Sequence, residues 1–150
     1  MSEENLFKDE AKNWHARGYF KFLQVSGKVD VQLKKTLKEF GVTHSQLNVL
    51  NLLVKNHPNP LDAKTIKEKL IVPSPDLTRL LDRLVKKELV KRETCLDNRR
   101  KLDITVTDKG IELFYAAHSK AKKSVKNYFE DYISEEEARE LFRILNKVQL

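Results

Sequence analysis

The sequence predicts a single domain, residues 1–150, of mainly α class with one small β-hairpin (α+β). Two observations indicate this fold: apolar residues recur every three to four positions along most of the chain, and the period changes to two near residue 102. With 40% hydrophobic residues over 150 positions, the chain is long enough to bury one core.

A long amphipathic helix is expected first, over residues 9–40. Its apolar positions are mostly three or four residues apart: Trp14, Tyr19, Phe22, Leu23, Val29, Leu33, Leu37 and Phe40. Gly41 follows at a C-cap position, which favours the end of the helix there. The next helix begins with the capping-box pattern from Thr43 to Gln46, and the segment 57–60, which contains two prolines, ends it.

Two shorter helices follow. Asp62 is the expected N-cap of a helix from Ala63 to about Leu70. Ser74 at the N-cap and Pro75 at the first helical position predict the start of the next one, which runs to about Lys87.

This last helix has two different faces. Its leucines and Val85 follow the i, i+3, i+4, i+7 spacing of a buried stripe. Arg79, Arg83 and Lys86 align on another side as a cationic ridge, with Thr78 at its N-terminal end and Asp82 alongside.

After Leu89 the pattern predicts a β-hairpin. Apolar Leu102, Ile104 and Val106 alternate with polar residues, as in a half-buried strand, and residues 90–94 are the expected antiparallel partner. Three cations of the run Asn98, Arg99, Arg100 and Lys101 fall where the chain reverses. Thr107 is then the expected cap of a long helix, and the capping box from Ser134 to Glu137 opens a final helix with Leu141, Ile144, Leu145 and Val148 on its apolar side.

Two short helices, a helix with a cationic ridge and a basic hairpin form the order of a winged helix-turn-helix. A helix of this kind presents side chains to base edges in the major groove, and a ribbon reaches the adjacent backbone or minor groove. Phosphates, or the negative potential of a narrow minor groove, would then neutralise Arg100 and its neighbours in place of protein carboxylates. The net charge of +7 and the sequence pI of about 9.4 agree with a polyanionic partner.

The stretch LTRLLDRLVKKELVKRETCLDNRRKLDITVTDKG, Leu77 to Gly110, resembles the recognition helix and wing of MarR-type (multiple-antibiotic-resistance regulator) transcription factors. The resemblance extends over nearly the whole chain. It implies a homodimer on a pseudo-palindromic operator, usually acting as a repressor. Residues 44–107 would form the DNA-binding lobe, while residues 9–40 and 108–150 would form the interlocking dimerisation part.

Carried over by position, the resemblance implies that five residues face the groove: Ser74, Asp76, Thr78, Arg79 and Arg83. Arg100 corresponds to the wing arginine that reaches the minor groove. With Lys86, Asn98, Arg99 and Lys101, these residues are the predicted DNA-binding set. The chain departs from the family pattern at Asn98, where an Asp is common two residues before the wing arginine, and at Glu88, where glycine is frequent.

The resemblance also implies a small aromatic or lipophilic effector between the dimerisation helices and the DNA-binding lobes. Trp14, Tyr19, Phe22 and Tyr115 are the candidate lining residues, although their helical spacing favours packing for most of them. Regulation would require only that the effector bind differently to conformations with different separations of the recognition helices.

Several other classes find little support in the sequence. It contains no Gly-rich phosphate loop, nucleophile elbow or HExxH pattern, so we expect neither an enzyme nor a metal or cofactor site. A structural role is favoured for Cys95, although nearby cations keep a redox role open. Neither a targeting segment nor a membrane span is predicted, which favours the cytoplasm. The main alternative function is a winged-helix protein-interaction module without specific DNA binding; a small enzyme is the other.

Overall fold

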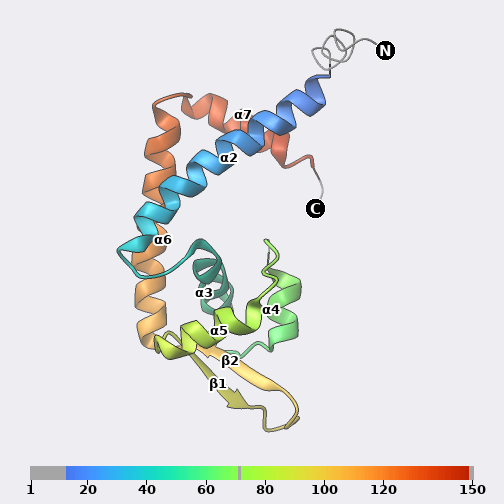
Figure 1. Ribbon diagram of the computed structural model, residues 1–150, viewed down its shortest axis with the longest axis vertical. Helices are drawn as coiled ribbons and strands as arrows, with labels where there is room; N and C mark the ends of the chain where they lie inside the picture. Colours follow the sequence, from blue (N-terminus) through green and yellow to red (C-terminus); the bar gives the residue numbers. More distant parts are fainter. Residues whose placement is uncertain (1–12, 71, 149–150) are drawn as a thin grey trace.

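The computed structural model describes residues 13–70 and 72–148, and within them the chain forms six helices and one two-stranded antiparallel hairpin (Figure 1). In chain order the elements are α2 (Trp14–Lys38), α3 (His44–Asn56), α4 (Ala63–Lys69), α5 (Leu77–Lys86), β1 (Val90–Thr94), β2 (Leu102–Val106), α6 (Asp108–Glu130) and α7 (Glu135–Leu145). This is the mainly α class with one hairpin that the sequence predicts.

The elements form two parts joined by α6. The lower lobe consists of α3, α4, α5 and the hairpin, and the upper arm consists of α2 and α7 (Figure 1). Helices α3, α4 and α5 pack together in the lobe, and the hairpin extends from its lower end (Figure 1). Helix α6 runs upward from the hairpin, contacts α3 and then α2, and leads into α7 near the upper end of the molecule (Figure 1). The hairpin and α5 therefore lie at the end of the molecule opposite the arm.

The core fills the lobe and continues to the crossing of α2 and α6. Leu50, Ile66 and Leu84 have no exposed surface, and Leu37 from α2 and Ala117 from α6 extend the same cluster. Leu77, Leu80, Leu81 and Leu84 are all buried, as the leucine stripe of α5 predicts. Because one face of α5 is held in the core, its remaining side chains point to solvent.

Local capping chemistry explains most helix starts. The Thr43 hydroxyl accepts a hydrogen bond from the Gln46 amide while the Gln46 side chain accepts one from the Thr43 amide, which confirms the predicted capping box. Ser134 and Glu137 form the same reciprocal pair at α7. Asp62 caps α4 and Thr107 caps α6, also as predicted. These bonds satisfy amides that have no partner within the helix.

The predicted start of α5 is wrong by two residues. Ser74 is not the N-cap and Pro75 is not the first helical residue; Asp76, with φ −117° and ψ 49°, is the N-cap and makes no side-chain capping bond. The helix instead begins at Leu77, the first of its leucines to enter the core. Packing of that apolar face therefore sets the start of α5.

The first helix also differs at its ends. Helix α2 ends at Lys38 with Glu39 as its C-cap, so Gly41 lies two residues beyond the cap, where it adopts a left-handed φ of 66°. At the other end the Asn13 side chain caps α2 by accepting a hydrogen bond from the Ala16 amide at 3.0 Å. The predicted extension over residues 9–12 lies outside the described residues.

The hairpin is held to the lobe by an isolated β-bridge at Leu61 and by close packing at its base. Val90 pairs with Val106 and Thr94 with Leu102, and Leu61 exchanges two backbone hydrogen bonds with Ile104 on the other side of β2. Ile104 and Val106 are buried, whereas Leu102, near the tip, is exposed, so the predicted inward face holds only for the inner half of β2. At the base, a Cβ on Gly110 would lie 2.2 Å from the Leu89 carbonyl oxygen, so glycine is required there.

The arm carries a large amount of exposed apolar surface. Trp14 and Phe142 are each 71% exposed, and Leu141, Ile144, Leu145 and Val148 are exposed as well. The predicted apolar side of the last helix therefore exists, but the part of the chain that the structure describes does not cover it. Searched over the same described residues, no helix is both long and apolar enough to cross a membrane.

Candidate nucleic-acid interface

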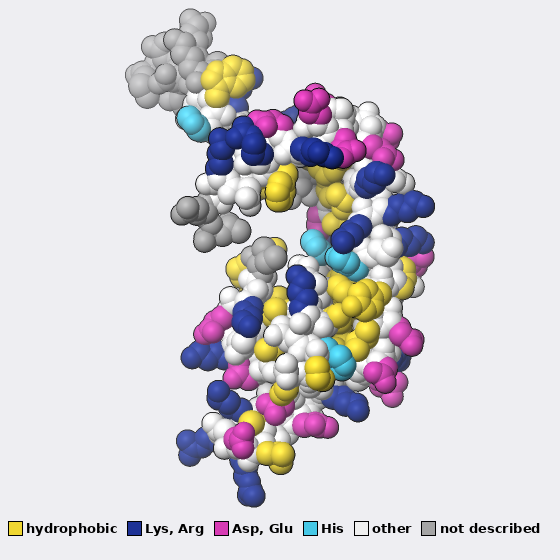
Figure 2. Space-filling view, turned by 180° about the vertical axis from the view of Figure 1, so that it is seen from behind, with side chains coloured by type: hydrophobic (Ala, Val, Ile, Leu, Met, Phe, Trp, Pro, Cys, Tyr) yellow, Lys and Arg dark blue, Asp and Glu magenta, His cyan; other side chains and the backbone are white. Residues whose placement is uncertain are grey.

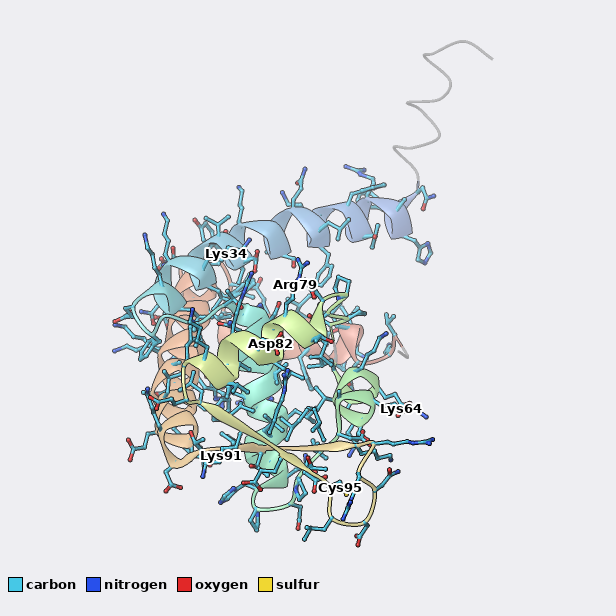
Figure 3. The ribbon with its side chains drawn as sticks, turned by 60° about the horizontal axis from the view of Figure 1, so that its bottom comes forward. Lys34, Lys64, Arg79, Asp82, Lys91 and Cys95 are labelled. Atoms are coloured by element: carbon cyan, nitrogen blue, oxygen red, sulfur yellow. The ribbon has the colours of Figure 1, made fainter. Side chains whose placement is uncertain are left out.

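Helix α5 presents a polar, mainly cationic face to solvent. Thr78, Arg79, Asp82, Arg83 and Lys86 are all exposed, while the leucines of the opposite face are buried. Figure 3 shows α5 along the front of the lobe, with Arg79 and Asp82 on it and the hairpin running below it. The predicted ridge therefore lies on the surface beside the wing.

The N-terminal end of α5 is open to a ligand. Asp76 makes no capping hydrogen bond through its side chain, which lies 3.5 Å from the Arg79 Nε atom instead. The first amides of a helix have no partner within the helix, and together with the helix dipole they favour an anion. Ser74, half-buried and just before this end, is close in sequence to these amides.

A tight turn places both wing arginines at its corner. The Lys101 amide donates to the Asn98 carbonyl at 2.8 Å, so Asn98 to Lys101 form a β-turn with Arg99 and Arg100 at its two central positions. The Asn98 side-chain oxygen accepts a hydrogen bond from the Arg100 amide at 3.1 Å. This is an Asx-turn, which explains how the chain keeps the turn without the family's Asp. In the space-filling view, Lys and Arg side chains project from this end of the molecule (Figure 2).

The third predicted wing cation is neutralised within the chain. The Lys101 Nζ atom lies 3.1 Å from Asp62 Oδ2, so the expectation that phosphates in place of protein carboxylates would neutralise Lys101 is wrong in this structure. Leu61 pairs with β2, and this bridge brings the next residue, Asp62, close to the outer end of that strand. Among the described residues, no carboxylate lies within 4.0 Å of the Arg99 or Arg100 side-chain nitrogens, so these two cations remain available to a ligand.

Asp62 has two partners, and both favour its charged form. The Thr65 amide donates to Asp62 Oδ1 at 2.7 Å, and Lys101 contacts Oδ2. The hydrogen bonds from Thr65 and the charge of Lys101 hold the pKa of the Asp62 carboxyl well below its usual range. Asp62 therefore caps α4 and ties the wing to it.

Arg92 is a residue at this surface that the sequence analysis did not single out. From β1 its guanidinium donates to Asp82 Oδ1 at 2.5 Å and to the Thr78 carbonyl at 3.3 Å, both on α5. A signal was present in the sequence, because Arg92 alternates with exposed Lys91 and Glu93 and so faces the lobe. Its partner was not predictable from spacing, because Asp82 lies ten positions away on another element.

The turn between α5 and the wing is linked to the start of α6. Glu88, where the family often has glycine, adopts a left-handed φ of 61°. The Thr107 hydroxyl donates to the Glu88 carbonyl at 2.7 Å, and Lys109 Nζ donates to the Lys87 carbonyl at 3.0 Å. The C-terminal end of α5 and the first turn of α6 are therefore joined by hydrogen bonds.

The candidate effector residues are not joined by any ring contact in the described chain. Tyr19 packs edge-on against Phe20, Tyr115 against Phe114, and the Arg17 guanidinium lies 4.4 Å from the centre of the Trp14 ring. Phe22 and the other three candidates are exposed. Their role in binding an effector stays a prediction.

Cys95, the remaining candidate from the sequence, lies in the wing. Cys95 follows β1 as a half-buried free thiol. Its amide donates to the Lys101 carbonyl at 3.0 Å, which adds one backbone hydrogen bond between the two sides of the wing. No group of three His, Cys, Asp or Glu side chains within residues 13–70 and 72–148 is arranged to hold a metal ion.

Helices α3 to α5, followed by a hairpin pinned against α5, define a winged helix-turn-helix protein. The model of the MarR family matches residues 40–101. The chain is 30% identical over 114 residues to the HTH-type transcriptional regulator MgrA of Staphylococcus aureus, covering 76% of this chain and 74% of that protein. It is 27% identical over 121 residues to the HTH-type transcriptional repressor MdtR of Bacillus subtilis, covering 81% and 76% of the two chains.

Solved structures show the same similarity in three dimensions. The S. aureus MepR–DNA complex matches with a TM-score of 0.74 and 25% identity, over 86% of this chain and 93% of that one. The chain belongs to the MarR family of transcriptional regulators.

Proposed function

We propose that the protein is a sequence-specific, double-stranded-DNA-binding transcriptional regulator that acts as a repressor in the cytoplasm. The observation that carries the proposal is that the exposed cationic ridge of α5 lies beside the hairpin that ends in the exposed Arg99–Arg100 turn. The relatives support it, because MepR is solved as a DNA complex and MdtR is named a repressor.

Each part of this surface has a distinct role in the proposal. Thr78, Arg79 and Arg83 face base edges in the major groove, with Lys86 toward the phosphates. Arg99 and Arg100 follow the adjacent backbone or the narrow minor groove, where Arg is attracted by negative potential. The open start of α5, with Ser74 and Asp76, lies at a phosphate. Asn98 shapes the wing, and Lys101 contributes through its ion pair with Asp62.

The proposed assembly is a homodimer on a pseudo-palindromic operator. Residues 44–107 form the DNA-binding lobe and residues 9–40 and 108–150 the dimerisation part. The exposed apolar surface of α2 and α7 supports this division, because a lone chain leaves it in contact with water. Two lobes on one face of the duplex place the half-site centres about one helical turn, roughly 34 Å, apart. Release by a small aromatic or lipophilic effector completes the proposal.

The test is selection from random duplexes with purified protein, followed by affinity measurements on the enriched sequence at several salt concentrations. We expect an enriched near-palindrome and a steep fall of affinity with salt. Arg79→Ala is expected to cost about 1 to 3 kcal/mol on the selected site and to relax base preference at one position. Arg100→Ala is expected to weaken binding to all duplexes and to reduce the salt slope by about one.

Lys64→Ala, an exposed cation of α4, is the matched charge control and should leave the base preference unchanged. Unchanged affinity in both arginine variants would contradict the docking model. Absent or salt-insensitive DNA binding by a folded dimer would favour the protein-interaction module instead.

A further inference from the structure

Arg92 connects the two elements that the proposed function places on DNA. It stands on β1 opposite Ile104 of β2, and its side chain is 24% exposed, against 55% for the side chain of Asp82. From there the guanidinium reaches α5, which follows a different direction from the hairpin (Figures 1 and 3). Arg92 is thus the wing side chain that contacts the solvent-facing side of α5.

The two acceptors lie close together on α5. Asp82 and Thr78 are four residues apart, and a helical carbonyl points toward the amide four positions further along, so the Thr78 carbonyl lies beside the Asp82 backbone. One guanidinium nitrogen donates to each of them. A planar group with several fixed donors holds both acceptors at once, which a single ammonium point charge does less well. The contact therefore restrains the angle between α5 and the wing as well as their separation.

The contact also neutralises the charge of the Asp82 carboxylate. Asp82 lies beside Arg83 on the exposed face of α5, so an unpaired carboxylate there would face the phosphates of a bound duplex. Arg92 supplies a compensating charge from the neighbouring strand β1. The formal charge of the pair is zero, so Asp82 does not reduce the attraction of the ridge cations for an anionic ligand.

We propose that Arg92 is a positioning and specificity-determining residue of the DNA interface. By bridging Asp82 and the Thr78 carbonyl, it neutralises the carboxylate and sets the geometry in which α5 and the wing engage one duplex together. This inference rests on the proposed function. It assigns to Arg92 no contact with DNA, which separates its role from that of Arg79 or Arg100.

The test uses four variants of the full chain: Arg92→Gln, Arg92→Lys, Asp82→Asn and the double variant Arg92→Gln/Asp82→Asn. Affinity is measured for the selected operator and for an unrelated duplex of equal length, over a range of salt concentrations. The double variant is the most discriminating of the four, because it removes the ion pair while keeping the net charge of the wild type.

For the double variant we expect wild-type affinity for the unrelated duplex, an operator preference reduced about tenfold, and an unchanged salt slope. Arg92→Gln alone should also weaken binding to the unrelated duplex, because Asp82 is left uncompensated. Arg92→Lys, which keeps the charge but loses the paired donors, should fall between the wild type and Arg92→Gln.

Two results would overturn the inference while leaving the proposed function intact. If the double variant had the operator preference of the wild type, Arg92 would have no positioning role. If the salt slope of the double variant were reduced by about one, Arg92 would be a phosphate contact instead. A wild-type protein that enriches no sequence would overturn both. Thermal unfolding checks each variant, and Asp82→Asn, an isosteric change at an exposed site, tests the same loss of preference if the Arg92 variants fail to fold.

Discussion

Glu88 is held in a backbone conformation that residues with a Cβ rarely adopt. Its φ of 61° lies in the left-handed region, in the short turn between α5 and β1. The turn is nevertheless maintained, because the Glu88 amide donates to Val85 and its carbonyl accepts from the Thr107 hydroxyl. Strain at one residue is thus offset by bonds on both sides of it.

Replacing Glu88 with glycine should stabilise the protein. Glycine adopts positive φ without the Cβ penalty, so we expect Glu88→Gly to raise the free energy of unfolding by about 0.5 to 1 kcal/mol after its larger loss of chain entropy. The exposed ion pair with Lys109 contributes little. Denaturant unfolding measures the change, and Glu88→Ala, which loses the ion pair but keeps the strain, is the control. Equal stability of the two variants would contradict this account.

The wing cations show how far residue type alone predicts a role. Arg99, Arg100 and Lys101 are adjacent and carry the same charge, yet only Lys101 is paired within the described chain, with Asp62 at 3.1 Å. The turn at Asn98 was predictable from local sequence. The partner of Lys101 was not, because Asp62 is brought to it by the pairing of Leu61 with β2.

At the level of elements, Asp62 joins α4 to the hairpin. Its carboxylate caps α4 through the Thr65 amide and pairs with Lys101 through its other oxygen. The folded state lowers the pKa of this carboxyl, first through the hydrogen bonds from Thr65 and then through Lys101. The unfolded chain therefore takes up the proton at a higher pH than the folded chain does.

The sign of the pH dependence follows from this difference. The stabilisation by Asp62 is complete above its ordinary pKa of 3.8 and is lost as the pH falls from there through the lowered value. Asp62→Asn keeps an N-cap but loses the ion pair and the titration. We expect this variant to be less stable than the wild type at pH 7 and the difference to shrink below about pH 4, as measured by thermal unfolding at a series of pH values. A difference that stays constant down to pH 2 would contradict the assignment.

Whether the start of a helix could be predicted depends on how far apart in the sequence the residues that set it lie. The starts of α3, α4, α6 and α7 follow from a side chain that bonds an amide three residues ahead, and each was predictable from sequence. The start of α5 was not, because Ser74 and Pro75 resemble a cap while the buried position of Leu77 decides where the helix begins.

At the scale of the whole molecule, the main feature is the apolar surface of the arm, which stays exposed to solvent among the described residues. Phe142 is 71% exposed on α7, and its apolar neighbours on the same helix are exposed too. The same arm meets the lobe of α3 to α5 through α6, whose first turn is bonded to the end of α5. In the proposed dimer, a change in how two arms pack would therefore be connected to the position of α5.

Phe142→Glu tests the proposed dimer. A charge on this surface would have to be buried at the interface, so we expect the dimer dissociation constant to rise about tenfold or more and operator affinity to fall with it. Sedimentation velocity over a concentration series measures the first quantity. Leu96→Glu, a change at a wing residue that is 99% exposed, is the matched control and should leave the dimer intact. A monomeric wild type, or a Phe142→Glu protein that dimerises as the wild type does, would contradict the assembly.

The sequence by itself determined the fold class, the order of the elements, the N-caps of α3, α4, α6 and α7, and the cationic character of α5 and the wing. Each of these depends on residues within a few positions of one another, where periodicity and capping chemistry act directly. Only the tertiary structure decided that Arg92 bridges Asp82 and Thr78, that Asp62 takes Lys101 out of the free wing cations, and that α5 begins at Leu77. These depend on contacts between separate elements, whose positions are set by how the common core packs.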